Sequence, residues 1–469
     1  MEQEMITVPK REYEALKAYV ATLEPIIAAL QARISELEAK PNKNSKNSNK
    51  PPSSDGPRKP TVKNSRIKTG KPSGGQTGHI GVTKLQTAAP DKIVKLIPAE
   101  TCDCGGKVSA MPDSYEARQV EDIVPVETIT IEYRAQDGVC SSCGKVHKAT
   151  FPEGVSGSIS YGENIRALAS YLLVYQLVPF KRTTELIEDM TGISISQGTV
   201  LTSYKEAYEK LADTEARIKE EVINADTVHF DESGMRVCGT NHWLHSASTE
   251  DCTVYSIHEK RGLIAMNDMG ILPNFRGTAV HDHWSSYYSY LQCAHAECNE
   301  HHLRQLKYLF EDLGEAWAGE IAVLLLRINR HVNLSRLFGA EHLLVQDIES
   351  YENMYRNILK NAEERSGTMG LESRRMVKRL LKYEQETLLF MLDFSVPFTN
   401  NLAERDIRMP KAKQKISGGF RSKNGASYYA RIRGFVSTVK KRGKRVMEGF
   451  KSVFQNKALS FIFDEPIST

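Results

Sequence analysis

The chain has 469 residues and a formal net charge of +4, and 40% of its residues are hydrophobic. This length allows two or three domains with buried cores. No run of about 18 apolar residues is present, and the start, MEQEMITVPKREYE, lacks the features of a signal peptide. Eight cysteines in a chain of this length do not indicate a disulfide scaffold. We therefore expect a soluble cytoplasmic protein with no membrane partner.

The positive charge is concentrated in two segments. Residues 40–85 contain eleven Lys and Arg against one acid, and residues 404–451 contain fifteen against three. The rest of the chain therefore carries a net charge of −18. Two basic segments on an otherwise acidic protein favour a polyanionic partner, most simply nucleic acid. Solvated tails are the alternative, and they suit the first segment better than the second, where aromatic residues are interspersed.

Residues 1–40 follow a heptad pattern with leucine at every seventh position and mostly β-branched residues at the matching a positions. This pattern predicts a parallel two-stranded coiled coil, and with it a homodimer or a higher oligomer. Pro25 should kink or split the helix, and an amphipathic helix packed on its own domain is the alternative. The leucines are Leu16, Leu23, Leu30 and Leu37, and the a positions hold Tyr13, Val20, Ile27 and Ile34.

Residues 41–88 change abruptly to a composition of Asn, Ser, Lys, Pro and Gly, as in NKNSKNSNKPPSSDGPRKP. Such a composition cannot bury a core. We expect a basic, disordered linker that contacts DNA phosphates.

Residues 89–155 contain two close cysteine pairs, Cys102 with Cys104 in TCDCGGKV and Cys140 with Cys143 in VCSSCGKVH. Each pair is followed by glycine, and this arrangement predicts a small domain around one structural Zn²⁺ with four thiolate ligands. His147 is an alternative ligand, and free or buried thiols are the alternative reading. The other four cysteines lack paired spacing and are expected in the core; for Cys298, which forms a CxxH pair with His301, we favour a structural role.

Residues 156–220 are helical in pattern. YGENIRALASYLLVYQLV is followed by RTTELIEDM, a turn at Thr191-Gly192, and SQGTVLTSYKEAYEKL. This order resembles a helix-turn-helix, which would bind DNA. A purely structural helical hairpin is the alternative, because the second helix offers few basic residues.

Residues 221–302 predict the first part of a catalytic core. DTVHFDESGMRV, NHWLHSAS and CTVYSIH read as three strands of an antiparallel meander, with Asp231 on the first. A helix over RGLIAMNDMGIL, a strand ending at Asp282, a helix over SSYYSYL and a short strand over HAECNE follow. This is the element order of a ribonuclease-H-like fold, which would place Asp231 beside Asp282. Turn residues at strand ends are the alternative for both.

Residues 303–395 are strongly helical in pattern and too long for a simple connection, so they predict a helical insertion. The last part of the core, with its basic C-terminal region, then occupies residues 396–469. Asn400 or Asn401 is expected to cap a helix whose first turn holds Glu404. Two aspartates and a glutamate are ligands that a two-magnesium phosphoryl-transfer site needs. A glutamate that only favours the helix dipole is the alternative for Glu404.

Nearly the whole chain resembles the insertion sequence 66 family of bacterial transposases. Besides the heptad start and the paired cysteines, the matching segments are NSKNSNKPPSSDGP, GGQTGHIG, PFKRTTELIEDMTGISISQGT, HFDES, HDHW, CNEHHLRQL and NNLAERDIRMPKAKQKISGGFRS. The resemblance implies a multidomain α/β protein with a ribonuclease-H-like core, a helical insertion and a zinc-binding region. It also implies a DDE triad, which carries onto Asp231, Asp282 and Glu404. Small accessory proteins of the element are implied as partners.

The activity that this resemblance implies is cleavage at the transposon ends and joining of their 3′ hydroxyls to target DNA, in a bacterial, nucleoid-associated setting. Two Mg²⁺ or Mn²⁺ ions would be held by the triad. Lys411, Lys413, Lys415 and Arg421 would contact phosphates beside the site. The alternatives are a DNA-binding relative that has lost catalysis and a nuclease that cuts without strand transfer.

Overall fold

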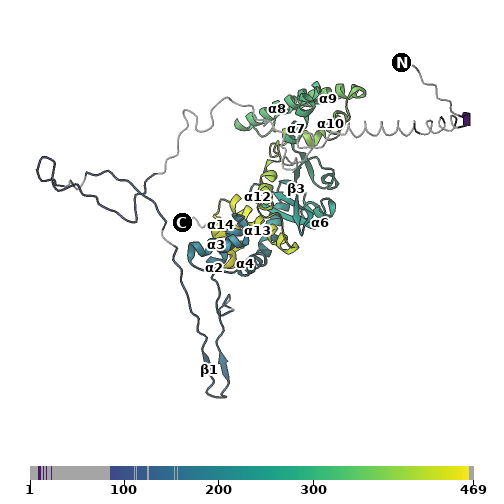
Figure 1. Cartoon of the computed structure of the whole chain (residues 1–469). Helices are drawn as coiled ribbons and strands as arrows, with labels where there is room; N and C mark the ends of the chain where they lie inside the picture. The colour runs from purple at the N-terminus through teal and green to yellow at the C-terminus, as the bar shows by residue number, and fades with distance from the viewer. Residues whose placement is uncertain are drawn as a thin grey trace. The chain divides into compact units, whose positions relative to one another are not determined.

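The computed structural model describes residues 85–463, except 110, 112–113, 124–125, 153 and 156, together with residues 9–11, 14, 17 and 23 (Figure 1). The described residues fall into two compact units. One lies within residues 211–444 with the few N-terminal positions, and the other is formed by residues 85–210 with 445–463. Both units contain helices and strands, as the expected mixed α/β class requires. Within these ranges no helix is both long and apolar enough to cross a membrane.

The expected coiled coil over residues 1–40 lies almost entirely outside the described residues, and so does the linker over 41–88 up to residue 84. Both expectations stay predictions. The few described positions after Pro9 are helical, and they are Lys10, Arg11, Glu14, Lys17 and Leu23.

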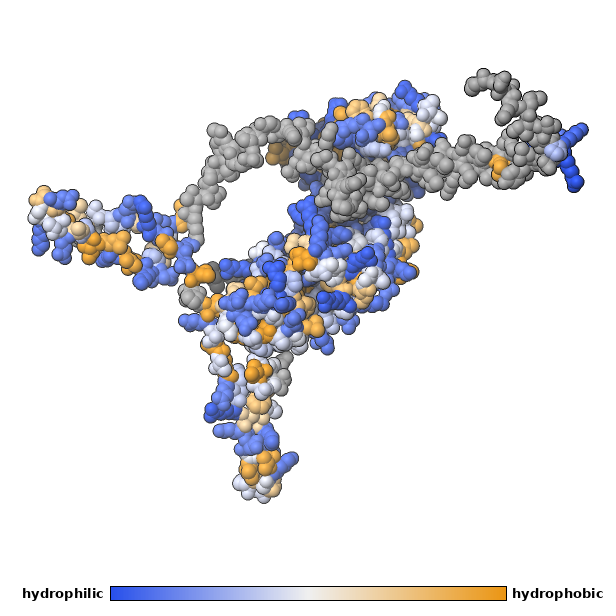
Figure 2. Space-filling view, viewed as in Figure 1, coloured by the Kyte–Doolittle hydropathy of each residue, from blue (hydrophilic) through white to orange (hydrophobic). Residues whose placement is uncertain are grey.

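Residues 85–160, which belong to the second unit, contain a single antiparallel pair of named strands in their described part. β1 (Asp137–Val139) pairs with β2 (Val146–Lys148), and the turn between them carries the second cysteine pair. Apolar side chains along this region are exposed, among them Ile129, Ile131 and Val139. Figure 2 shows hydrophobic atoms, in orange, on the arm of the chain that carries β1 in Figure 1. These apolar residues are therefore not part of a buried core.

The helices of the second unit are α2 (Glu163–Ser170), a π-helical turn η2 (Tyr171–Tyr175), α3 (Phe180–Thr191), α4 (Gln197–Lys210), α14 (Val446–Phe454) and α15 (Ala458–Phe463). α14 packs on α2 and α4. α3 ends at Gly192, which adopts φ = 71°, and Ser196 Oγ accepts a hydrogen bond of 3.0 Å from the Thr199 amide at the start of α4. Because glycine adopts positive φ without strain and serine caps helices, the sequence ends one helix here and starts the next. The predicted order of helix, glycine turn and helix is therefore present.

The first unit is built on a five-stranded sheet with the order β5-β4-β3-β6-β7. The strands are β3 (Thr227–Val237), β4 (Thr240–Ser248), β5 (Thr253–His258), β6 (Thr278–His281) and β7 (Ala294–Glu297). β3, β4 and β5 are antiparallel neighbours, whereas β6 runs parallel to β3 and β7 runs parallel to β6. The alternating residues of the three predicted meander strands form these first three strands, and the two later strands also lie where the sequence places them.

Between these strands the helix expected over RGLIAMNDMGIL is α6 (Leu263–Met269), followed by a 3₁₀ turn, η3 (Leu272–Asn274). The helix expected over SSYYSYL is wrong, because only a 3₁₀ turn, η4 (Tyr287–Ser289), forms there. Tyr287 is buried and stacks on His281 at a centroid distance of 4.3 Å. Tyr290 is also buried, with its hydroxyl bonded to Asn267. Tyrosine has only modest helix propensity, so these tertiary anchors decide the local conformation.

Three helices cover the sheet around β3, β4 and β5: α5 (Ala212–Ile223), α12 (Asn401–Ser417) and α13 (Lys423–Lys441). Met235 and Val237 of β3 pack with Ile407 of α12 in one buried cluster. Side chains alternate between the two faces of a strand, so the odd-numbered side chains of β3 face α12. α13 crosses β5 closely, because a Cβ at Gly434 would lie only 3.0 Å from the Thr253 carbonyl oxygen.

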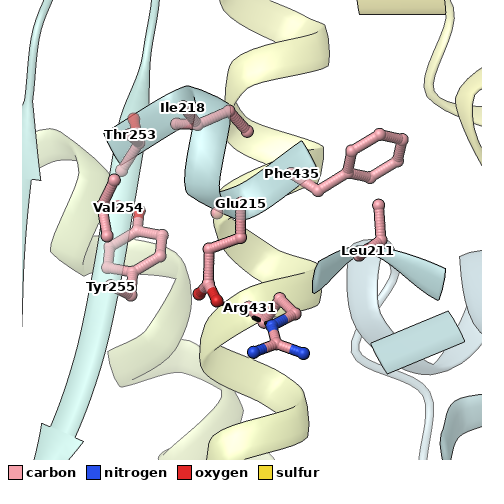
Figure 3. A pocket seen from close by; sticks show the side chains of 9 residues that line it. Leu211, Glu215, Ile218, Thr253, Val254, Tyr255, Arg431 and Phe435 are labelled. Atoms are coloured by element: carbon pink, nitrogen blue, oxygen red, sulfur yellow. Dashed lines mark hydrogen bonds and ion pairs between the residues drawn. The ribbon is translucent and has the colours of Figure 1, made fainter. Parts of the chain in front are cut away.

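A small pocket lies between α5, β5 and α13 (Figure 3). Apolar side chains such as Leu211, Ile218 and Phe435 line it, and Glu215 forms an ion pair of 2.7 Å with Arg431. Its cavity volume is about 10 Å³. A space of this size holds about one water molecule, so we interpret it as a packing gap beside the close helix crossing.

The region predicted to be helical over 303–395 contains α7 (Asn299–Glu311), α8 (Ala316–Leu337), α9 (Val345–Glu364), the 3₁₀ turn η5 (Ser366–Thr368), α10 (Leu371–Lys382) and α11 (Glu384–Leu392). These helices share one buried cluster with Val280 of β6 and Ala296 of β7. Apolar residues at helical spacing, such as Ile321, Leu325 and Ile328 of α8, form its centre. The helices therefore rest on the edge of the sheet that carries β6 and β7.

Gly277, which precedes β6, is the glycine with least room for a side chain among those that the structure describes. A Cβ there would lie 2.3 Å from the Asp226 carbonyl oxygen and 2.7 Å from that of Ala225. We expect Gly277→Ala to lower the free energy of unfolding by roughly 1–3 kcal/mol, the range typical of overpacking. Gly367→Ala is the matched control, because a Cβ there meets no atom within 4 Å. Urea denaturation of both variants measures the difference, and equal stability would contradict the close packing of β6 against the start of β3.

Candidate active site

Asp231 lies in the middle of the central strand β3, on the face that α12 covers. Val228 and Phe230, which precede it on the strand and point to the opposite face, are buried, and this fixes the register of the strand. Its Oδ1 accepts a hydrogen bond of 2.8 Å from the Glu232 amide, and Ser246 Oγ of β4 donates to its carbonyl oxygen at 3.1 Å. The strand and these two bonds hold the carboxylate in place.

Asp282 is the first residue after β6. His229 of β3 is registered with Val280 of β6, and the two strands are parallel. Two residues further along each strand are Asp231 and Asp282, so the register brings the two aspartates side by side. Asp282 Oδ1 accepts a hydrogen bond of 2.9 Å from the Trp284 amide. The prediction that these two carboxylates lie together rested on element order, and the strand pairing supports it.

Glu404 lies in the first turn of α12, as predicted, and the residue that places this helix is Asn400. Asn400 is buried and bonds through three of its atoms. Its Nδ2 donates to the Phe230 carbonyl at 2.7 Å, its Oδ1 accepts from His229 Nδ1 at 2.8 Å, and its amide donates to Cys298 Sγ at 3.1 Å. α12 is thereby attached to β3 directly before Asp231.

The charges of the other two carboxylates act on Asp231. Burial raises the pKa of Asp231 well above its usual range, and the charges of Glu232, Asp282 and Glu404 raise it further. Burial, followed by the charge of Glu232, raises the pKa of Asp282 to about 7. Burial also raises the pKa of Glu404, against which the charges of Arg304 and Arg408 act. Clustered carboxylates of this kind are stable as anions only beside a compensating cation.

The donor set fits a divalent cation. Glu404 Oε1 is buried and has no hydrogen-bond partner in the described part of the chain. A buried carboxylate oxygen without a partner is costly unless a cation or a water satisfies it. Carboxylate oxygens are the ligands that Mg²⁺ and Mn²⁺ prefer. Asp231, Asp282 and Glu404 offer this kind of ligand, although the three together are not among the described groups whose donor atoms all lie within 4.8 Å of one another.

Glu232, the residue after Asp231, points to the other face of the sheet. Tyr287 donates to its Oε2 at 2.7 Å, and Arg261 Nε donates to its Oε1 at 3.0 Å. The Arg261 guanidinium lies over the rings of Trp243 and Trp284, at 4.9 and 4.2 Å from their centroids. The charge of Arg261 partly offsets the rise in the pKa of Asp282 that burial and Glu232 cause. Glu232 thus lies with its two partners on the opposite face of the sheet from Asp231. The sequence offered no signal for these partners.

The four cations predicted to contact phosphates differ in exposure. Lys415 and Arg421 are exposed, whereas Lys411 is half-buried and donates to the Gly234 carbonyl at 2.8 Å. Lys413 is only 9% exposed, and burial lowers its pKa to about 8. The geometry therefore suits Lys415 and Arg421 for contact with a polyanion better than Lys413.

The two cysteine pairs lie in separate tight turns. In the first turn the Cys102 amide donates to the Gly106 carbonyl, and in the second the Gly144 amide donates to the Cys140 carbonyl. Hydrogen bonding with Cys104 lowers the pKa of Cys102, and hydrogen bonding with Cys143 lowers that of Cys140. Within each pair the thiols are therefore close.

The structure does not gather the four paired cysteines into one ligand set. Among the described residues, Cys298, His301 and Glu404 are instead the group of three potential ligands whose donor atoms lie within 4.8 Å of one another. The sequence marked the first two as a CxxH pair but did not connect them with the glutamate.

Comparison with known proteins assigns the family. The model of a family described as "Transposase IS66 family" matches residues 158–428, which is more than half of the chain and includes all three carboxylates. Residues 5–84 match a second model, described as a family of unknown function (DUF6444). A search of curated proteins found no match. The first match confirms the resemblance seen in the sequence, and the chain belongs to the transposase IS66 family.

Proposed function

We propose that this protein is the DDE transposase of an insertion sequence, which cuts the transposon ends and joins their 3′ hydroxyls to target DNA. The observation that carries the proposal is that the charges of Asp282 and Glu404 both act on the carboxylate of Asp231. The sheet order, with three antiparallel strands followed by two parallel ones, supports a ribonuclease-H-like catalytic core. The family match supports a transposase role and DNA as the partner.

In this proposal Asp231, Asp282 and Glu404 would hold Mg²⁺ or Mn²⁺. Two such ions at a phosphoryl-transfer site activate the attacking oxygen and stabilise the leaving one. The strand pairing of β3 with β6 orients the two aspartates, and the Asn400 contacts orient the glutamate. Because these carboxylates are already held in position, little conformational entropy is lost when the reacting groups bind beside them.

Two phosphoryl transfers follow at this one site. In cleavage, a water oxygen forms a bond to phosphorus at the transposon end, the P–O3′ bond breaks, and a free 3′ hydroxyl leaves. In joining, that hydroxyl attacks a phosphorus of the target strand and displaces the target's own 3′ oxygen, so the number of phosphodiester bonds is conserved. Two groups of basic residues would neutralise the DNA phosphates. One is the exposed pair Lys415 and Arg421, and the other is the pair near Glu404, Arg304 and Arg408.

Two other functions would use the same fold. A DNA-binding relative that has lost catalysis has no need for three clustered carboxylates, and their presence favours an enzyme. A nuclease that cuts without joining differs only in the second transfer, and a strand-transfer assay distinguishes it. We further propose a homodimer or higher oligomer and accessory proteins of the element as partners.

We also propose that one Zn²⁺ joins the two cysteine turns. The paired thiols of Cys102 with Cys104 and of Cys140 with Cys143 are two halves of a four-thiolate site. Zinc binding would draw the exposed apolar residues around them together, since a structural metal supplies folding free energy directly.

Replacing any of the three carboxylates should abolish DNA cleavage. We expect Asp231→Asn, Asp282→Asn and Glu404→Gln each to lower the cleavage rate at transposon ends at least about 100-fold, because transition-state charge is then unbalanced. DNA binding should persist. Asp312→Asn, at an exposed position at the end of α7, is the matched control. Labelled end fragments with Mg²⁺ measure cleavage and gel shift measures binding; near-normal cleavage by one variant would remove that residue from the site.

The raised carboxylate pKa values predict how stability depends on pH. Asp282 has a folded pKa of about 7, against about 3.9 in an unfolded chain. Between these values the folded state binds more protons, so the metal-free protein should lose about 1 kcal/mol from this group between pH 6 and pH 8. The pKa of Asp231 is also raised, so this carboxyl likewise lowers the stability of the metal-free protein as the pH rises. Asp282→Asn should flatten the slope, and Mg²⁺ should stabilise the wild type more at pH 8; denaturation without metal that is independent of pH would contradict this.

Zinc content tests the cysteine pairs. Cys140→Ser should lower the zinc content of the purified protein by about one ion per chain and make residues 100–150 more sensitive to protease. Cys238→Ser, which removes an exposed thiol outside the pairs, should retain it. Elemental analysis gives the result, and equal zinc in Cys140→Ser and wild type would defeat the proposal.

A further inference from the structure

A second donor set adjoins the three carboxylates. Cys298 is the N-cap of α7, His301 lies in the first turn of that helix, and Glu404 lies in the first turn of α12. Their sulfur, nitrogen and oxygen donor atoms all lie within 4.8 Å of one another. The CxxH spacing produces this arrangement, because residues three apart lie on the same face of a helix. Two helix starts therefore present three different donors to one point.

Two atoms of this group are buried and unsatisfied. His301 Nδ1 and Glu404 Oε1 have no hydrogen-bond partner within the described residues, although they lie only 3.7 Å apart. That separation is too long for a good hydrogen bond. It is close to the separation of roughly 3.3–3.4 Å between two ligands of a tetrahedral zinc ion, given Zn–N and Zn–O bonds of about 2.0–2.1 Å. An ion placed between them would satisfy both atoms.

The third donor, Cys298 Sγ, has a thiol whose pKa is raised by burial, so it would become a thiolate only beside a bound cation. It is buried and accepts the hydrogen bond from the Asn400 amide at 3.1 Å. Hydrogen bonds to a metal-bound sulfur are the usual support for such a ligand. Sulfur and imidazole are ligands for Zn²⁺ and other thiophilic transition metals, whereas Mg²⁺ takes oxygen ligands. The donor chemistry therefore discriminates between the two kinds of ion.

We propose that Cys298, His301 and Glu404 form a binding site for Zn²⁺ or a similar thiophilic transition metal, distinct from the four paired cysteines. Three protein ligands leave a fourth coordination position open. Glu404 belongs both to this site and to the proposed magnesium site, so occupancy of one withdraws a ligand from the other. Zinc bound here should therefore inhibit magnesium-dependent DNA cleavage. This last consequence rests on the proposed function of Glu404, whereas metal binding itself does not.

Cobalt spectroscopy on the full chain tests the site. With Cys102, Cys104, Cys140 and Cys143 all replaced by serine, addition of Co²⁺ should produce a sulfur-to-cobalt charge-transfer band in the near ultraviolet, which Zn²⁺ then bleaches. Cys298→Ser in this background should abolish the band, and His301→Asn should weaken Co²⁺ binding at least about tenfold, as loss of a ligand predicts. Cys252→Ser, at a buried thiol far from the group in sequence, should leave the band intact.

If the fourfold serine background does not fold, the difference in absorbance between Co²⁺-loaded wild type and Cys298→Ser gives the same information. An unchanged band after Cys298→Ser in either background overturns the site and leaves the proposed transposase function untouched.

The inhibitory consequence has its own readout. For each variant, cleavage with Mg²⁺ is measured with and without added Zn²⁺ and expressed relative to that variant's own zinc-free rate. Wild type and Cys252→Ser should be inhibited at Zn²⁺ concentrations at which Cys298→Ser is not. A cobalt band without any zinc inhibition of the wild type would overturn the shared use of Glu404.

Discussion

The buried side chain of Asn400 connects the parts of this site that are farthest apart in the sequence. Its amide group bonds to Phe230 and His229 of β3, and its backbone amide bonds to the sulfur of Cys298. Because α12 begins at the next residue, these bonds fix where the first helical turn lies relative to the central strand. A carboxylate in that turn, Glu404, then lies near enough to Asp231 for its charge to raise the pKa of that aspartate. The long helical segment between Asp282 and Asn400 can therefore be large without disturbing the site.

The second constraint is electrostatic. Burying Asp231 and Asp282 beside other acids raises their pKa values. The free-energy cost of their charges is offset by burial of the hydrophobic clusters around β3 and α8. Compensation by the chain is incomplete: Arg261 pairs with Glu232, and Arg304 and Arg408 act on Glu404, but Glu404 Oε1 keeps no hydrogen-bond partner among the described residues. This imbalance supports the proposal that the site binds cations. The nearby thiol and imidazole of Cys298 and His301 add a softer donor set, so the kind of cation matters as well as its charge.

Much of this arrangement could be predicted from the sequence, because it depends on local patterns. Alternating residues around Asp231 define β3, and the Asn-Asn pair before LAERDIR marks the start of α12. The hydrogen bond from Asn400 to Phe230 joins residues 170 positions apart, and no local pattern signals it. Lys413 is buried although it lies in a basic run, since the helix turns it toward the sheet. The segment around Tyr287 was expected to be a helix, but ring stacking on His281 and the burial of Tyr290 leave only one 3₁₀ turn. Tertiary contacts, rather than propensity, decided these three features.

The central claim is that Asp231, Asp282 and Glu404 share bound divalent ions. Fe²⁺ substituted for Mg²⁺ generates hydroxyl radicals in the presence of ascorbate and peroxide, and these cut the backbone near the residues that hold the ion. Mass spectrometry of the fragments from full-length protein should show three sets of cuts, around residues 231, 282 and 404, that excess Mg²⁺ suppresses. Cuts confined to the cysteine-rich segments, or an absence of cuts near either aspartate, would contradict the account.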